Sequence, residues 1–219
     1  NKCTIEEREE YDPWVKLEIP IYAGVDYGKI LKKAEKEADV IIWDGGNNDM
    51  SFYKPDLNIV VLDPHRAGHE MLYYPGEVNF KAADVLVINK MDSAPKEGIK
   101  KLMENIKKHN PKATVIKAAS KLVIENPKSL KGEKVLIVGD GPTLTHGGMS
   151  FGAGTIAAKK YGAKIVEPHK FIVGTLKETY KKYPHLVHGK ELPAMGYTPK
   201  QNKDLQDTIN KSKVDMVID

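Results

Sequence analysis

The sequence predicts an α/β protein with mostly parallel sheets, and two observations support this class. Short apolar runs that are rich in β-branched residues alternate with longer segments whose apolar residues recur at helical spacing. This alternation is typical of strand–helix–strand units around a parallel sheet. The chain has 219 residues, of which 41% are hydrophobic, so it can form one large α/β domain or two small ones.

The first part of the chain contains four predicted strands and two predicted helices. The strands are expected at residues 39–46, 57–63, 83–90 and 113–120, and the helices at residues 28–38 and 95–111. Each helical segment places its apolar residues on one face, which would pack against the sheet. The second helix is bounded by Pro95 at its start and by Asn110 and Pro111 at its end.

The alternation restarts after a polar stretch, residues 126–134, which contains proline and glycine. We therefore expect a first domain over 1–129 and a second, Rossmann-like α/β domain over 130–219. In the second domain we expect strands within 134–142, 163–168 and 214–219, and helices within 147–162, 175–184 and 202–212. Because the chain starts at Asn1 and stops inside a β-branched run, we expect it to be truncated at both ends.

Composition and charge argue against several classes of protein. The net charge is only +4, and no basic stripe carries interleaved aromatic residues, so we expect no nucleic-acid partner. No apolar run approaches the roughly 18 residues of a transmembrane helix, so we expect no membrane partner. The one cysteine, Cys3, allows no internal disulfide, which suggests the reducing cytoplasm. The sequence leaves open whether the protein forms a homo-oligomer.

Four polar residues stand at the ends of predicted strands. They are Asp44, Asp63, Asn89 and Asp140. In open parallel sheets, ligands bind beyond the carboxyl ends of the strands. We therefore expect the functional residues of this protein to cluster at those ends.

The pattern Asn-Lys-x-Asp, which GTPases use to bind guanine, follows the strand predicted at 83–90. In that interpretation Asp92 accepts from the ring N–H and the exocyclic amine, Asn89 bridges the base to neighbouring loops, and Lys90 covers one face of the ring. Ser120 lies one strand–helix unit later, where GTPases carry a short Ser/Ala-Lys element. The alternative is a strand-to-helix turn in which Asp92 or Ser93 caps the next helix.

The stretch at 40–49 resembles a Walker B strand. Asp44 at the end of an apolar run could hold Mg²⁺, and Gly45 and Gly46 would let the backbone approach a phosphate. The alternative is an ordinary strand that ends in a Gly-Gly/Asn-Asn turn.

A phosphate-binding loop is missing from this arrangement. The nearest candidate, residues 23–30, has Ala23 and Ile30 where the motif Gly-x-x-x-x-Gly-Lys-Ser/Thr needs glycine and a hydroxyl. We reject it, and we expect any such loop to lie upstream of Asn1.

A polar loop at residues 63–70 follows the second predicted strand. His65, Arg66 and His69 could neutralise a substrate or a transferred phosphate. The alternative is a solvated loop in which Arg66 pairs with Glu70.

The region with the highest density of glycine and threonine, residues 138–154, follows a strand and opens a helix. Its backbone N–H groups could bind an anion at the helix start. A dinucleotide fingerprint is incomplete, because Leu144 stands where the third glycine would be. The alternative is a connection that allows close helix–strand packing. The candidate substrate- or phosphate-binding residues here are Asp140, Thr143, Thr145, His146 and Gly147.

Several long stretches, in order along the chain, resemble the cyclic 2,3-diphosphoglycerate synthetase family and its relatives described as predicted GTPases. They are TIEEREEY, YAGVDY, DVIIWDGGNND, PDLNIVVLDPHRAGHE, YYPGEVNFKAADVLVINKMDSAP, VGDGPTLTHGGM, GAGTIAAKKYGA and LPAMGY. The resemblance implies a P-loop NTPase core whose Walker A segment precedes this chain. It also implies a protein about twice as long, and a reaction that uses ATP to join the two phosphates of 2,3-diphosphoglycerate.

Together these observations predict an enzyme that couples NTP hydrolysis to phosphate activation or to phosphoanhydride formation on a small phosphorylated or carboxylated substrate. The expected cofactors are Mg²⁺ and either GTP or ATP, because the guanine motif and the ATP-dependent reaction of the family disagree. Alternatives are a GTPase switch and a non-catalytic module that binds an anion or a nucleotide. Without the phosphate-binding lysine, the chain alone is expected to be inactive.

Overall fold

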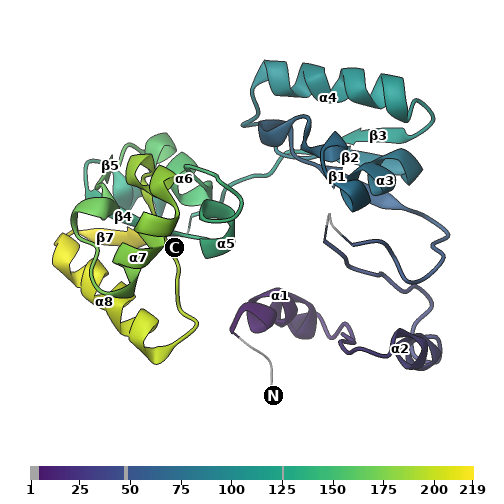
Figure 1. Cartoon of the computed structure of the whole chain (residues 1–219), viewed down its shortest axis with the longest axis horizontal. Helices are drawn as coiled ribbons and strands as arrows, with labels where there is room; N and C mark the ends of the chain where they lie inside the picture. The colour runs from purple at the N-terminus through teal and green to yellow at the C-terminus, as the bar shows by residue number, and fades with distance from the viewer. Residues whose placement is uncertain (1–4, 47–48, 125) are drawn as a thin grey trace. The chain divides into compact units, whose positions relative to one another are not determined.

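The computed structural model describes residues 5–46, 49–124 and 126–219, and it divides the chain into two compact units (Figure 1). The first unit is Asn1–Ser120 and the second is Lys121–Asp219. Each unit is built around a parallel sheet, so the predicted α/β class is confirmed.

The boundary between these units precedes the one expected from the sequence at residues 129 and 130. Ile124 and Leu130 both pack against the core of the second unit. Leu130 ends the short 3-10 helix η3 (Pro127–Leu130) and is buried there. An apolar residue just before the polar stretch and another within it thus place that stretch in the second unit.

Three parallel strands form the sheet of the first unit, in the order β1, β2, β3. Each lies within a strand that the sequence predicts: β1 (Ile59–Leu62), β2 (Val85–Ile88) and β3 (Thr114–Lys117). Leu62 pairs with Ile88, which pairs with Lys117, so the three strands end side by side. Residues that follow the strands therefore meet at one edge of the sheet.

One face of this sheet is covered by two helices, α3 (Tyr74–Ala82) and α4 (Lys96–His109) (Figure 1). Phe80 from α3 and Leu102 and Ile106 from α4 pack with Leu86 and Ile88 of the sheet. Along β1 and β3 the intervening side chains point the other way, and among the described residues Ile59, Val61 and Ile116 remain exposed. A parallel sheet is usually covered on both faces, so this face is unusually apolar for a surface.

The first unit begins with two helices, α1 (Ile5–Lys16) and α2 (Tyr27–Ala34). The helix predicted at 28–38 corresponds to α2 but ends at Ala34. Its start is capped by Asp26, whose carboxylate accepts from the Lys29 N–H at 3.0 Å. A cap of this kind satisfies one of the free N–H groups of the first turn.

The strand predicted at 39–46 is wrong. Residues 41–46 carry no regular structure, and Val40 and Ile42 are 77% and 84% exposed. A β-branched run forms a strand only when a neighbour supplies backbone partners, and within the described residues no strand pairs with this one. Asp44 is therefore not at the end of a strand.

A second parallel sheet is centred on β4 in the other unit. Its strands are β4 (Lys134–Gly139), β5 (Lys164–Ile165), β6 (Glu191–Pro193) and β7 (Met216–Ile218). All three neighbours pair with β4, β5 near its start and β6 near its end. The short β6 was not expected, because Glu-Leu-Pro has no β-branched residue.

Helices cover both faces of this second sheet. Val135 and Ile137 pack with Ala158 of α6, whereas Leu136 packs with Leu176 of α7. The helices of this unit are α5 (Gly141–Leu144), α6 (Ala153–Tyr161), α7 (Thr175–Lys182) and α8 (Pro199–Ser212), with short 3-10 helices η4 (Pro168–Lys170) and η5 (Pro184–His188). Among the described residues of the whole chain, no helix has the length and apolarity to cross a membrane.

Candidate functional site

The carboxyl edge of the β1-β2-β3 sheet is held together by backbone hydrogen bonds. The N–H of Asn89 donates to the Leu62 carbonyl at 3.0 Å, and the N–H of Ala118 donates to the Ile88 carbonyl at 2.9 Å. The Met91 N–H then donates to the Ala118 carbonyl at 3.0 Å. These bonds extend beyond the strands and fix the loops that carry the predicted site residues.

Asp63 is the centre of a charged cluster at this edge. One of its carboxylate oxygens, Oδ2, lies 2.9 Å from Nζ of Lys90 and 3.3 Å from Nη2 of Arg66. The other oxygen accepts from the His65 N–H at 3.0 Å. The side chain of Asp63 is only 17% exposed, so both cations are attracted into a partly dehydrated position.

The pKa of Asp63 reports the balance of forces in this cluster. Burial raises the pKa, but the hydrogen bond from Lys90, the His65 N–H and the charges of Lys90 and Arg66 outweigh it. The net result is a pKa below the ordinary value of an aspartate. Asp63 therefore stays ionised at neutral pH and can hold both cations at the edge of the sheet.

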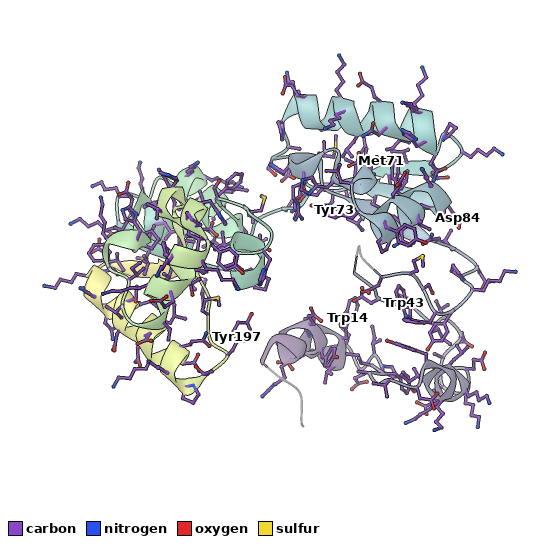
Figure 2. The ribbon with its side chains drawn as sticks, viewed as in Figure 1. Trp14, Trp43, Met71, Tyr73, Asp84 and Tyr197 are labelled. Atoms are coloured by element: carbon purple, nitrogen blue, oxygen red, sulfur yellow. The ribbon has the colours of Figure 1, made fainter. Side chains whose placement is uncertain are left out.

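Two short 3-10 helices that follow Asp63, η1 (Pro64–Arg66) and η2 (His69–Met71), position the predicted catalytic histidines differently. His65 Nε2 lies 3.1 Å from Oγ of Ser93, beside the cluster. The ring of His69 instead makes an edge contact with Tyr73, with the ring centres 5.7 Å apart (Tyr73 is labelled in Figure 2). His65 is thus connected to the carboxyl edge through Ser93.

The alternative pairing of Arg66 with Glu70 is not formed. Arg66 pairs with Asp63, whereas Glu70 accepts from the Gly68 N–H at 2.7 Å and from the Asn105 side chain at 2.6 Å. Glu70 therefore fastens this loop to α4, and Arg66 remains beside the cluster.

The predicted base-reading loop meets its predicted partner loop. Asp92 Oδ1 accepts from the Ser120 N–H at 3.0 Å, which joins the ends of β2 and β3. The alternative, in which Asp92 or Ser93 caps a helix, is not observed, because α4 begins after Pro95 with no side-chain cap. Asp92 is exposed and each carboxylate oxygen can accept more than one hydrogen bond, so it keeps acceptor capacity for a ligand.

Lys90 adopts a left-handed backbone conformation, with φ of 55°. This conformation is uncommon outside glycine and marks a backbone held by its surroundings. Its ammonium group pairs with Asp63, so the stem of Lys90 crosses from β2 towards β1. Half-buried Asn89 precedes it at the same edge.

The predicted Walker B residues lie in the segment between α2 and β1. Asp44, Gly45 and Gly46 are exposed there, and the Gly46 N–H donates to Asp49 at 3.2 Å. Within the described part of the chain, no hydrogen bond or ion pair joins Asp44 to Asp63 or to the predicted base-reading loop at 89–92. The described residues contain no group of three or more His, Cys, Asp or Glu side chains that could hold a metal.

The glycine- and threonine-rich loop of the second unit is held largely by its own hydrogen bonds. Asp140 caps α5 by accepting from the Thr143 N–H at 2.8 Å. Thr145 is buried and donates its hydroxyl to the Gly141 carbonyl at 2.7 Å. His146 and Gly147 are exposed, so His146 is the candidate donor of this loop that is most accessible to a ligand.

The start of α6, where the sequence suggests an anion, is filled by a carboxylate of the protein itself. Glu191 is 2% exposed and its Oε1 accepts from the N–H groups of Gly152 and Thr155, at 2.7 and 2.8 Å. The N–H groups of this helix start are therefore satisfied from within. Sequence analysis missed Glu191 because the residue lies in the short β6, a strand that the sequence did not predict. The Glu-Leu-Pro stretch itself is the only signal in the sequence that could have drawn attention to it.

A cavity of about 400 Å³ lies in the second unit next to His146. Its walls come from the end of α5, from α7, and from the segment that leads into α8. Thr145 and His146 are the two predicted substrate-binding residues that line it; Asp140 and Thr143 do not.

Comparison with known proteins relates the first unit to a family. Residues 20–119 match the family model described as "Cyclic 2,3-diphosphoglycerate synthetase, P-loop domain". These residues are therefore similar to the P-loop domain of that family. The matched range includes the β1-β2-β3 sheet, both of its covering helices and the predicted base-reading loop at 89–92, so the family resemblance predicted from the sequence is confirmed.

A relative of the synthetase P-loop domain comes from Thermococcus kodakarensis and is described as "Arginine synthetase ArcE". It is 60% identical over 218 residues, which are 99% of this chain and 48% of the relative. The chain thus spans about half the length of this curated relative, and the similarity covers both units.

Proposed function

We propose that the whole protein is an NTP-dependent synthetase, in which the first unit binds the nucleotide and the second binds the small molecule that is activated. The observation that carries this proposal is the carboxyl edge of the β1-β2-β3 sheet. There, a P-loop domain of a synthetase family brings Asp92, Ser120 and the Asp63 cluster onto neighbouring loops.

The nucleotide base would lie against the loop after β2. Asp92 would accept from the ring N–H and exocyclic amine of guanine, a donor pair that adenine lacks, and the stem of Lys90 would cover one ring face. Asn89 would link this loop to the base. A preference for GTP follows from Asp92, whereas the family's named reaction favours ATP, so the base is decided by experiment.

The remaining charged groups would act on phosphate. Arg66 and His65 lie where they could neutralise negative charge during phosphoryl transfer, which depends mainly on positioning and electrostatics. Mg²⁺ in NTP sites commonly takes one or two carboxylates, phosphate oxygens and water. The single exposed carboxylate of Asp44 fits one such ligand, with Gly45 and Gly46 beside it for close approach of a phosphate.

Two substrate classes compete for the second unit. The family model is described by a synthetase of cyclic 2,3-diphosphoglycerate, a phosphorylated acid. The relative that shares both units is described as a synthetase of arginine, an amino acid. The 60% identity extends through the second unit, so we place arginine first and the phosphorylated acid second.

The proposal is tested with the protein produced from its complete gene, Mg²⁺, and either ATP or GTP, followed by phosphorus NMR. Running the reaction backwards with arginine, nucleoside diphosphate and phosphate should produce the triphosphate. Joining the diphosphate to phosphate releases one water, which is taken up as one C–N bond of arginine is cleaved to a carbonyl compound and an amine or ammonia. With 2,3-diphosphoglycerate, a new anhydride resonance would instead support the phosphorylated acid. Phosphate release that neither compound changes would support a GTPase switch, and no turnover at all would support a non-catalytic module.

Two variants assign the base. Asp92→Asn should weaken GTP binding about tenfold or more and leave ATP binding unchanged if Asp92 contacts guanine. Asp56→Asn removes an exposed carboxylate from the same unit and serves as the control. Equal affinities of all three proteins for both nucleotides would exclude a role of Asp92 in base binding.

The chain of residues 1–219 should by itself release little or no phosphate from ATP or GTP. Its sequence contains no Gly-x-x-x-x-Gly-Lys-Ser/Thr motif, and the motif's lysine stabilises the transferred phosphate. A phosphate-release assay on this chain, beside the complete protein, checks the expectation. Comparable rates for the two would show that phosphate binding does not need that motif.

A further inference from the structure

The cavity of the second unit combines opposite charges in one small volume. Glu178 and Lys182 both line it, and they lie one turn apart on α7, where side chains share a face. Among the described residues, none of the ion pairs joins Glu178 to Lys182. A helix face that presents an acid and a base to the same cavity without pairing them suits a ligand that carries both charges.

The basic side of the cavity is arranged by a chain of contacts. Lys182 lies over the ring of Tyr183, with Nζ 5.3 Å from the ring centre. The hydroxyl of Tyr183 lies 3.0 Å from Nδ1 of His146, which also lines the cavity. These three side chains offer hydrogen-bond donors and one permanent positive charge, which is the chemistry that binds a carboxylate.

Two oxygen acceptors in the same cavity can bind the positively charged end of such a ligand. Glu178 supplies a carboxylate, and Gln201, in the first turn of α8, supplies an amide oxygen. That Oε1 is buried and has no hydrogen-bond partner among the described residues. A buried acceptor without a donor is costly, so its presence at a cavity wall indicates a ligand that brings N–H groups.

We propose that this cavity binds an amino acid whose side chain ends in a donor-rich cation, as the guanidinium of arginine does. The carboxylate of the amino acid would lie towards Lys182, His146 and Tyr183, and its N–H groups towards Glu178 and Gln201. The volume of about 400 Å³ falls in the usual range for small-molecule sites. The choice of arginine among such amino acids rests on the proposed function; the pairing of charges rests on the cavity alone.

Glu178 distinguishes the proposed amino-acid site from a site for a phosphorylated acid. A phosphorylated acid would be repelled by a carboxylate in the same cavity, whereas a guanidinium forms paired hydrogen bonds to one. Tyr197, labelled in Figure 2 on the loop before α8, adds an aromatic surface to the same wall, on which a guanidinium can stack.

The test is a titration of isotope-labelled residues 1–219, without nucleotide, followed by amide NMR. Arginine, inorganic phosphate and 2,3-diphosphoglycerate are added separately, each to about 10 mM, which covers dissociation constants into the millimolar range. We expect arginine to shift amide signals from Thr145, Thr179 and Gln201 and to leave those of β2 unchanged. The proposal fails if arginine shifts none of the cavity signals, or if only the two phosphorus compounds shift them.

Paired variants show which charges matter. Glu178→Gln should weaken arginine binding about tenfold or more, while Asp207→Asn on the neighbouring α8, outside the cavity, should not. Lys182→Met should also weaken arginine binding, while Lys181→Met should leave it unchanged. The replaced side chains are exposed, and the spectrum itself reports whether each variant is folded. Equal binding by all four variants would overturn the proposed arrangement.

This experiment separates the cavity from the proposed reaction. Arginine binding in the second unit, with no turnover by the complete protein, would support the cavity and refute the synthetase. Turnover with arginine that Glu178→Gln leaves unchanged would support the synthetase and place its substrate elsewhere.

Discussion

Asp63 holds two cations at the carboxyl edge of the first sheet, because Lys90 and Arg66 approach the same carboxylate oxygen. The cluster links the end of β1 to the loop that follows β2. The pKa of Asp63 is lowered in the folded state. A carboxyl group with a lowered pKa contributes its full stabilisation at pH values above its unfolded pKa of 3.8. That stabilisation is lost as the pH falls through the lower, folded pKa.

Asp63→Asn should therefore destabilise the first unit by about 1–2 kcal/mol at pH 7, and by less at pH 3, which lies below the unfolded pKa of 3.8. The amide of asparagine can still accept from His65 but carries no charge for Lys90 and Arg66. Amide exchange of β2 at the two pH values measures the difference, with Asp56→Asn as the exposed control. An equal loss at both pH values would show that the charge of Asp63 is not what stabilises the cluster.

Glu191 is a buried acid whose structural role is clear from its contacts. Its Oε1 caps α6 from the neighbouring β6, through the N–H groups of Gly152 and Thr155. Gly139 and Gly152 leave room for the carboxylate, since a Cβ at either would lie within 3 Å of Oε2. The fold thus reserves space around this one side chain.

Glu191→Ala should lower the free energy of unfolding of the second unit by about 2–4 kcal/mol, because two buried N–H groups lose their acceptor. Glu191→Gln keeps an oxygen in the same place and should cost less. Urea unfolding of both variants measures the order, with Glu167→Ala at an exposed surface position as the control. If Ala and Gln cost the same, acceptance by Oε1 is not the stabilising interaction.

At the level of elements, the sequence pattern identified the runs that can form strands, whereas pairing with neighbours decided which of them do. β1, β2 and β3 lie inside predicted strands because each apolar run has parallel neighbours that complete its hydrogen bonds. The run at 39–46 has an equally strong pattern but no neighbour among the described residues, so it forms no strand. β6 has the reverse property, because pairing with β4 makes a strand of Glu-Leu-Pro.

The candidate site residues likewise divide into those that sequence patterns mark and those that only packing brings together. Asp92 and Ser120 were predicted together, because each follows a strand and strand order brings their loops together. Lys182, Glu178 and Gln201 carry no motif and meet only through the packing of α7 on α8, so sequence patterns could not connect them.

Gly174 shows how closely α7 and α8 are joined. It has φ of 51°, and a Cβ on it would lie 2.2 Å from Asp204. Asp204 accepts from both the N–H and the hydroxyl of Thr175, at 2.8 Å each, and these bonds lower its pKa. Contact with the start of α7 thus leaves no space for a side chain at Gly174.

Gly174→Ala should destabilise the second unit by about 1–3 kcal/mol. Gly148→Ala is the matched control, because Gly148 has φ of 63° but nothing within 4 Å of the added Cβ. Gly148→Ala should be less destabilising, because alanine there meets only the cost of a left-handed backbone and no steric contact. Thermal unfolding measures both, and equal losses would mean that the contact with Asp204 adds nothing.

At the level of the whole molecule, the two units differ in how completely their sheets are covered. In the second unit β4 has strands on both sides, and helices pack on both faces. In the first unit, Ile59 and Val61 on one face of the sheet are exposed among the described residues. Apolar area left in water contributes nothing to stability, so the first unit buries less for its length.

Unfolding of residues 1–219 in urea should therefore occur in two steps, with the first unit unfolding at the lower concentration. Amide NMR signals from β2 and β4 report the two units separately, and their disappearance should not coincide. Glu191→Ala provides the internal check, because it should move the β4 transition to lower urea and leave the β2 transition in place. A single shared transition that this variant shifts as a whole would show instead that the two sheets unfold as one cooperative body.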